Sequence, residues 1–278
     1  MHVRTVDQSL DAIRNLSLTE VRDFHGEFYG TEYGEIAIVG DFDPTEVRKS
    51  LESLFLGWVS PNTYAPISTR HASVKSVNER LETPDKPNAV LMARQNLSLK
   101  VIDEDYPALT VASYIFGGGA MKSRLGDRLR QKEGLSYDVS SIIRADDSID
   151  GKDDAGYLII QAISAPENMG KVELGVKEEL TNLVAQGITA DELKDAVSSI
   201  LTLREQSLAD DGNVASLLAG QLYFGRTLQF TERMNNRYKS LTLDQVNTAI
   251  KKHINAGMLS TYAAGSFENI KNIDSGDR

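Results

Sequence analysis

Arg130 and Tyr137 are the residues of this 278-residue chain whose types and spacing best suit chemistry on a peptide bond. They lie in the stretch RLRQKEGLSY, where Gly134 follows Lys132 and Glu133 at the point where a helix should end. We therefore expect Arg130 in the last turn of a helix and Tyr137 at the start of the next strand. A guanidinium offers planar charged donors and a phenol offers a directional O–H, so together they could hold a peptide carbonyl or a developing oxyanion.

The same spacing also permits a purely structural arrangement. In that arrangement Arg130 pairs with Asp127 or Glu133, while Tyr137 packs on the sheet. Spacing alone favours this second arrangement, so a chemical role for the two residues needs support from other signals in the sequence.

Three glycines before Lys122 and Ser123 imitate a phosphate-binding loop. A Walker-type loop needs Gly immediately before the Lys-Ser pair, where Met121 stands, and a dinucleotide fingerprint starting at Gly117 needs Gly in place of Lys122. The preceding run ALTVASYIF has a helical character rather than that of a buried strand. We therefore expect no nucleotide, and we expect the glycines to let two helices turn against each other.

The stretch DDSIDGKDDAGY imitates the first half of a calcium loop. Asp146, Ser148, Asp150 and Gly151 fit the pattern, but Tyr157 stands where the bidentate Glu is required. An acidic, solvated hairpin is the expected structure of this segment.

Histidine spacing excludes a zinc helix. Zinc hydrolysis needs two imidazoles on one helix face with a carboxylate that activates water, and the four histidines, at positions 2, 25, 71 and 253, are too far apart. His25 and His253 are expected to be ordinary surface or boundary residues. No G-x-S-x-G elbow is present, and the chain has no Cys. We therefore expect no catalytic residue and no metal ligand in this chain.

Composition limits the class of protein. The chain is 41% hydrophobic, which can supply a proper core, and its formal net charge is −10. No cluster of Lys and Arg is large enough to neutralise a row of phosphates, so nucleic acid is not an expected partner. No apolar run approaches the ~18 residues of a spanning helix, and MHVRTVDQSL lacks the apolar core of a signal peptide. Periplasmic and cytoplasmic locations both remain open.

Helix starts are marked by capping residues, and strands by short β-rich runs. Capping oxygens three residues before Glu or Gln predict helices that start at Ser17, Asp43, Thr189 and Thr242, with Pro44 at a first helical position. Strands are expected at 35–42, 88–97, 136–145, 156–165 and 258–265. Runs of strands separated from runs of helices predict an α+β fold, with a mainly antiparallel sheet covered by helices on one face.

Two segments of the chain resemble each other. Residues 16–42 and 241–267 align without gaps at an offset of 225, and in both a capped helix is followed by an apolar strand that ends in Gly. A capped helix followed by a strand is common, so the alignment alone leaves repetition open. If the chain is repetitive, residues 1–58 are the tail of a first domain whose beginning is missing and 73–270 a complete second domain. Residues 59–72 are then a linker, and 271–278 a polar tail.

The motifs resemble those of the insulinase/pitrilysin family of zinc metallopeptidases. SRLGDRLRQKEGLSYDV is similar to the family segment S-R-L followed by L-R-E-x-x-G-L-x-Y, with Gln131 in place of the common Glu. The stretch from LSLTEVRDFHGEFYG to IAIVGDFDPTEV is similar to a second family segment, and the resemblance covers residues 5–268. It implies tandem homologous domains, the first of which is incomplete here.

The resemblance also implies a function. In the family the first domain carries an H-x-x-E-H zinc motif that this chain lacks, and the second, non-zinc domain closes a chamber over the substrate. Arg130 and Tyr137 match the residues that reach toward peptide bound at that zinc.

The chain is then the C-terminal, non-zinc half of a peptidase, inactive alone. Its expected partners are a peptide or small protein substrate and an N-terminal domain or partner subunit that holds the zinc. The alternative is a non-catalytic scaffold or binding subunit that kept the fold; a hydrolase with an unrecognised site of its own is the weakest reading.

Overall fold

The computed structural model describes residues 4–119, 122–149 and 151–268. The chain divides into two compact units, one formed by residues up to 67 together with 211–223, the other by 68–210 together with the residues from 224 onward. The boundaries at 58 and 73 expected from the repeat stay a prediction, and the predicted tail at 271–278 lies outside the described residues.

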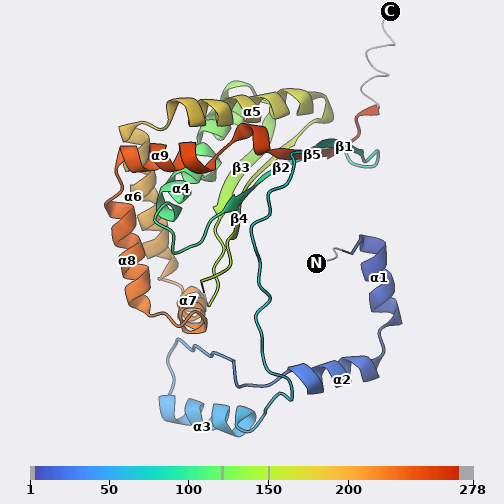
Figure 1. The fold of residues 1–278 in the computed structure, drawn as a ribbon, viewed down its shortest axis with the longest axis vertical. Helices are drawn as coiled ribbons and strands as arrows, with labels where there is room; N and C mark the ends of the chain where they lie inside the picture. The colour runs from blue at the N-terminus through green and yellow to red at the C-terminus, as the bar shows by residue number, and fades with distance from the viewer. Residues whose placement is uncertain (1–3, 120–121, 150, 269–278) are drawn as a thin grey trace, which may run out of the picture. The chain divides into compact units, whose positions relative to one another are not determined.

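A five-stranded sheet is the centre of the second unit. Its strands are β1 (Asn78–Glu82), β2 (Ala89–Ser98), β3 (Ser136–Arg144), β4 (Ala155–Ser164) and β5 (Ser260–Gly265). They lie in the order β1-β5-β2-β4-β3 (Figure 1). The β1–β5 pair is parallel and the other three pairs are antiparallel, so the prediction of a mainly antiparallel sheet is confirmed.

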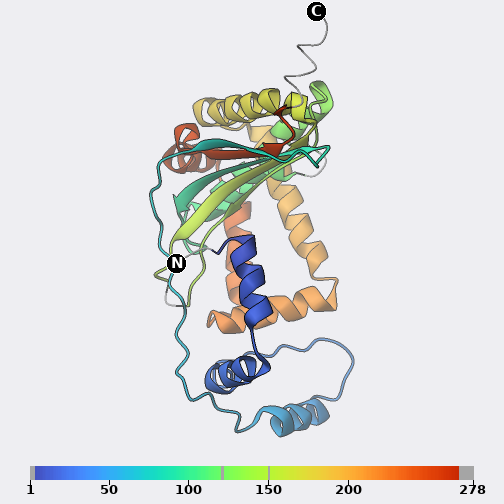
Figure 2. The ribbon, with the colours of Figure 1, turned by 90° about the vertical axis from the view of Figure 1, so that its right-hand side faces the viewer.

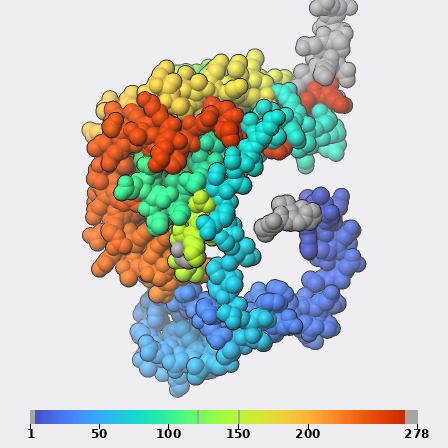
Figure 3. Space-filling view, in the orientation of Figure 1, coloured from blue at the N-terminus to red at the C-terminus, as the bar shows by residue number. Residues whose placement is uncertain are grey.

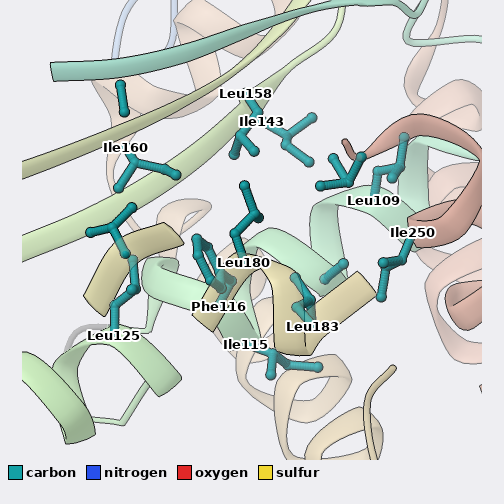
Figure 4. Packing of buried hydrophobic residues seen from close by; sticks show 14 of the residues in the cluster. Leu109, Ile115, Phe116, Leu125, Ile143, Leu158, Ile160, Leu180, Leu183 and Ile250 are labelled. Atoms are coloured by element: carbon teal, nitrogen blue, oxygen red, sulfur yellow. The ribbon is translucent and has the colours of Figure 1, made fainter. Parts of the chain in front are cut away.

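One face of the sheet is buried and the other is not. Along β2 and β4 buried residues alternate with more exposed ones, as the two-residue period of a strand requires. Leu91, Leu158 and Ile160 point into the core, where they meet the helices that cover this face. Figure 4 shows Ile160 and Leu158 facing Leu180 and Phe116 across this core.

Helices follow the strands in the order that the sequence predicts. They are α4 (Tyr106–Ser113), α5 (Met169–Gln186), α6 (Ala190–Ser207), α8 (Leu228–Lys239) and α9 (Leu243–His253), with the short 3-10 turns η3 (Pro166–Asn168) and η4 (Ala256–Met258). In Figure 2, α5 (yellow) lies along one side of the sheet. The capping boxes at Thr189 and Thr242 are both formed. The α+β fold class is therefore confirmed.

The glycines of residues 117–119 lie between two helical segments, residues 106–118 and the segment that starts at residue 124. Gly117 and Gly118 end a π-helical segment, η1 (Tyr114–Gly118), which packs against β3 at Ser141. A Cβ on Gly117 would lie 2.7 Å from the backbone nitrogen of Ser141, so only Gly permits this approach. The expectation that the glycines let two helices turn against each other stays a prediction, and the close contact that requires Gly117 is with a strand.

The first unit consists of α1 (Val6–Asn15), α2 (Leu18–Phe28), α3 (Pro44–Phe55) and α7 (Asp211–Tyr223). Ser17 forms the predicted capping box, and Asp43 caps α3 with Pro44 at its first position. None of the described residues of this unit, whose helices α1–α3 are blue in Figure 3, is buried. Most apolar side chains of α1 and α2 are exposed, and Val47, Leu51 and Phe55 of α3 are half-buried.

The strand expected at 35–42 was wrong. Residues 34–39 are without regular structure, and no described strand pairs with them. The apolar run IAIV has the composition of a strand, but a strand forms only where a second strand satisfies its backbone groups.

The acidic hairpin between β3 and β4 has a structural role in the second unit. The carboxylates of Asp153 and Asp146 accept hydrogen bonds from the hydroxyls of Ser68 and Thr69. Asp154 accepts the backbone N–H of His71 at 2.9 Å. The hairpin thus binds residues 68–71, the segment that leads into β1. The expectation of a purely solvated hairpin was therefore incomplete.

Leu180→Ala, compared with Leu174→Ala in the same helix, should show how much burial of Leu180 adds to the free energy of unfolding. Leu180 is fully buried in α5, so Leu180→Ala should lower the free energy of unfolding by about 2–5 kcal/mol through lost burial and a residual cavity. The matched control is Leu174→Ala in the same helix, whose side chain is 56% exposed. Urea unfolding followed by circular dichroism checks both, and equal losses for the two variants would contradict the described core.

Candidate functional site

The segment that carries Arg130 is helical from residue 124 and continues as a π-helix, η2 (Gly126–Lys132). Ser123 starts it, because its hydroxyl accepts the N–H of Gly126 at 3.2 Å and its carbonyl accepts that of Asp127 at 2.8 Å. Leu125 and Leu129 are fully buried below it. The S-R-L stretch at 123–125 is therefore a structural start signal for this element.

Arg124 ties the start of η2 to α6. Its guanidinium donates to both carboxylate oxygens of Glu192, at 2.8 Å each, and to the carbonyl of Gly187, also at 2.8 Å. Glu192 also accepts the N–H of Thr189 in the capping box, at 2.7 Å. A bidentate pair of this kind fixes orientation as well as distance.

The ion pair shifts both groups toward their charged forms. Burial alone would raise the pKa of Glu192, but hydrogen bonds from Arg124 and Thr189 outweigh it and hold the pKa below the ordinary value. The hydrogen bonds to Glu192 raise the pKa of Arg124. The charged pair is thus a stable part of the fold at neutral pH.

Arg128 ties the middle of η2 to α5. It pairs with Glu133 at 2.9 Å and Glu179 at 3.1 Å, and also with Glu178. These carboxylates, Glu178 first, raise the pKa of Arg128. The sequence offered Glu133 as a partner of Arg130, whereas the structure pairs Glu133 with Arg128.

Leu129 sets how closely η2 approaches α5. A Cβ on Gly175 of α5 would lie 2.6 Å from Leu129 Cδ2, so Gly at this position makes room for the leucine. The α5 helix and η2 are therefore in direct contact at this point. Arg130 follows Leu129 directly and lies in the last turn of η2, as the sequence predicts.

Gly134 and a β-bulge orient Tyr137. Gly134 adopts φ +62°, the left-handed turn expected after the helix, and Leu135 donates its N–H back to Leu129 at 2.8 Å. The ladder between β3 and β4 then shifts register between Ser136 and Asp138, which leaves Tyr137 as the extra residue. Its side chain is 62% exposed on the edge strand, so the alternative in which Tyr137 packs on the sheet does not hold.

A cleft of about 680 Å³ lies beside η1 and the start of η2, along α6. Tyr114, Lys122, Asp195 and Ser199 contribute to its lining. Neither Arg130 nor Tyr137 lines this cleft, so the residues predicted from the motif and this cavity are separate features.

A second, more polar cavity of about 620 Å³ lies where α9 ends against the start of α4. There Asp105 accepts from Lys252 at 2.6 Å and lies 2.8 Å from His253 Nε2. Burial alone would raise the pKa of Asp105, but these two partners lower it. His253 is a boundary residue, as expected; its carboxylate partner could not be found from sequence, since the two residues lie 148 positions apart.

Within 4–119, 122–149 and 151–268, no three His, Asp or Glu side chains are grouped so as to hold a metal ion. Over the same residues no helix is long and apolar enough to cross a bilayer.

The second unit is an α+β domain, a five-stranded sheet covered by helices on one face. The sequence profile described as the peptidase M16 inactive domain matches residues 15–200, which is more than half of the chain. The chain therefore belongs to the family of peptidase M16 inactive domains, and the predicted relationship to the zinc metallopeptidases is confirmed.

Individual relatives agree with this assignment. The non-peptidase homolog YmxG of Helicobacter pylori is 23% identical over 87% of this chain and 54% of its own length. An uncharacterized zinc protease of Streptomyces coelicolor is 24% identical over 89% of this chain and 53% of its own length. The crystal structure of a peptidase M16 inactive domain from Pseudomonas fluorescens is similar with a TM-score of 0.75 at 25% identity, over 92% of this chain and 59% of that one. The chain thus spans about half the length of the relatives that it matches.

The Arg124–Glu192 pair predicts a pH-dependent loss of stability. Glu192→Gln should lower the free energy of unfolding at pH 7 by about 1–3 kcal/mol, because it leaves the Arg124 charge without its carboxylate. The pKa of Glu192 is lowered in the folded state, so the carboxylate stabilises the fold above its unfolded value of 4.5 and this contribution fades as the pH falls through the folded pKa. The difference between wild type and variant should therefore shrink below about pH 4.5.

Urea unfolding between pH 7 and acidic pH measures this difference. Glu205→Gln, at an exposed position of the same helix, serves as the control. A difference that stays constant with pH would contradict the charged pair.

Proposed function

We propose that this chain is the non-zinc half of a zinc-dependent peptidase, in which Arg130 and Tyr137 contact peptide bound at a zinc held elsewhere. The observation that carries the proposal is the exposed side chain of Tyr137. Tyr137 is the extra residue of a β-bulge and follows Arg130 by seven positions. Bulges commonly direct a side chain toward a functional site. The frame of Arg124, Arg128 and Leu129 supports the same role, since it fixes the element that presents Arg130.

The two side chains suit the stabilisation of a tetrahedral intermediate. Attack of a zinc-bound water on a peptide carbonyl turns its oxygen into an oxyanion, and the guanidinium and the phenol can both donate to it. They can also orient the peptide before the attack. Zinc would supply the activated water from the other half, while this chain would close the chamber over the substrate.

The exposed apolar residues of the first unit support the proposal of a second, zinc-bearing half. Both boundaries of α9 lie 225 residues after those of α2 (243 less 18, and 253 less 28), the same offset as in the sequence alignment. In the second unit Ala263 of β5 is 1% exposed, whereas the equivalent Ile38 is 43% exposed. We propose that α2 and residues 35–40 close a sheet whose other strands lie on the zinc-bearing half, as α9 and β5 close the sheet of the second unit.

Replacement of either side chain should lower turnover without loss of zinc. We expect Arg130→Gln and Tyr137→Phe each to reduce kcat about 100-fold or more, as removal of one oxyanion donor does. The measurement is peptide cleavage and zinc content of this chain combined with the polypeptide that carries H-x-x-E-H. Arg233→Gln, an exposed arginine on α8, is the matched control. Unchanged cleavage by both variants would refute the assigned roles.

Addition of the zinc-bearing half should order residues 35–40 as a strand. Their backbone amides should then gain protection from hydrogen exchange, because pairing in a sheet satisfies and shields them. Ile38→Asp should prevent this association, since the substitution puts a charge on the face that becomes buried. Lys49→Asp, at an exposed position of α3, is the control. Exchange rates that do not change on addition would count against the shared sheet.

The alternative is a scaffold or binding subunit without a part in cleavage. The relative described as a non-peptidase homolog favours this possibility. It predicts stable association with the other half, and cleavage that is indifferent to Arg130 and Tyr137. The same complementation experiment distinguishes the two functions.

A further inference from the structure

The face of the sheet opposite the helices carries a pattern of side chains that the motif residues do not explain. We call this the open face, and it includes Met92, Arg94 and Asn96 of β2, Tyr157 and Ile159 of β4, and Ile142 and Arg144 of β3. All seven are exposed or half-buried, while their neighbours along each strand point to the core.

Two arginines surround one aromatic ring on this face. The guanidinium carbon of Arg94 lies 4.2 Å from the centre of the Tyr157 ring, a cation–π contact. Arg144 is directly opposite Tyr157 in the β3–β4 register, and residues opposed in this way have Cβ atoms about 4.5–5.5 Å apart. Two positive charges therefore flank Tyr157 from the neighbouring strands.

Neither arginine has an ion-pair partner in the part of the chain that the structure describes. Among the residues that the structure describes, Arg94 donates to the amide oxygen of Asn96 at 3.1 Å, and neither it nor Arg144 forms an ion pair. The acids closest to Arg144 in sequence are Asp146 and Asp147. Asp146 accepts the hydroxyl of Thr69 and the N–H of Ala155, and Asp147 pairs with Arg226. Asp138, on the same strand as Arg144, is roughly 20 Å away along β3, beyond the screening length of about 8 Å.

Apolar side chains continue the same face. Ile159 is paired with both Arg94 and Ile142 in the register, and Met92 follows in the next row. Ile142 and Met92 are each more than a third exposed. A ligand that covers this face must therefore place anionic groups and apolar groups in neighbouring rows, about 7 Å apart along a strand.

We infer that the open face binds an extended peptide segment in which an acidic side chain lies against Arg94 and Arg144 and apolar side chains lie against Ile142, Ile159 and Met92. Charge complementarity selects this occupant, because a carboxylate can accept from both guanidinium groups. An extended peptide also presents side chains at the two-residue spacing of the sheet. The inference rests on the proposed function, and names the class of substrate that the chamber takes.

Binding of designed peptides by the full chain tests the inference. The probe is a peptide of alternating Thr and Val with one central Glu and an uncharged fluorophore, compared by fluorescence anisotropy with versions that carry Gln or Lys at the centre. We expect the Glu peptide to bind about tenfold or more tightly than the Gln peptide, through charge-assisted hydrogen bonds. The preference should weaken as the salt concentration rises.

Variants of the two arginines give the matched comparison. Arg94→Gln with Arg144→Gln should abolish the preference for Glu, and Arg94→Glu with Arg144→Glu should reverse it toward the Lys peptide. Arg22→Gln with Arg48→Gln removes the same charge from exposed positions of the first unit and should leave the preference intact. Circular dichroism confirms that each variant is folded.

Three outcomes overturn the inference. They are the absence of peptide binding, equal binding of the Glu and Gln peptides, and a preference that survives in the Arg94→Gln, Arg144→Gln variant. Sedimentation velocity adds a fourth, because a dimer of the chain that this variant abolishes would make the open face a contact between two copies. A Glu preference combined with cleavage that ignores Arg130 and Tyr137 would refute the proposed function alone.

Discussion

The close contact between η2 and α5 is the constraint on which the candidate site depends. Leu129 fits against the backbone of α5 because residue 175 is glycine, and the contact is buried. Arg130 is the next residue, so a shift of Leu129 would displace Arg130 with it. Placement of the guanidinium is therefore a consequence of core packing, which resists small changes because protein interiors are closely packed.

Ion pairs formed by Arg124 and Arg128 complete the frame. Arg124 reaches α6 through Glu192, and Arg128 reaches α5 through Glu178 and Glu179. Partly buried ion pairs contribute little net stability, but they specify one arrangement of the elements that they join. In this chain they hold the start and the middle of η2, while Gly134 and the bulge at Tyr137 redirect the chain after it. The result is a rigid support for two side chains rather than an enclosed active centre.

The two units show the same sequence pattern with opposite outcomes. A capped helix followed by an apolar strand is buried and paired at α9 and β5, whereas α2 and residues 35–40 are exposed and unpaired among the described residues. The difference lies in what surrounds each copy, because hydrophobic burial and strand pairing need a partner surface. This contrast is the observation behind the proposal that α2 and residues 35–40 complete a sheet with another half.

Local signals in the sequence determined the α+β class, the capped helices at Ser17, Thr189 and Thr242, the helix stop at Gly134 and the family of the chain. Each of these depends on a few neighbouring residues, whose backbone preferences and hydrogen bonds act within one turn. Contacts between distant residues were decided by the tertiary structure. Arg124 meets Glu192, His253 meets Asp105, and Arg94 stacks on Tyr157, each across 60 or more positions of the sequence. The strand expected at 35–42 failed for the same reason, since a β-strand is completed by a neighbour that no local pattern can supply.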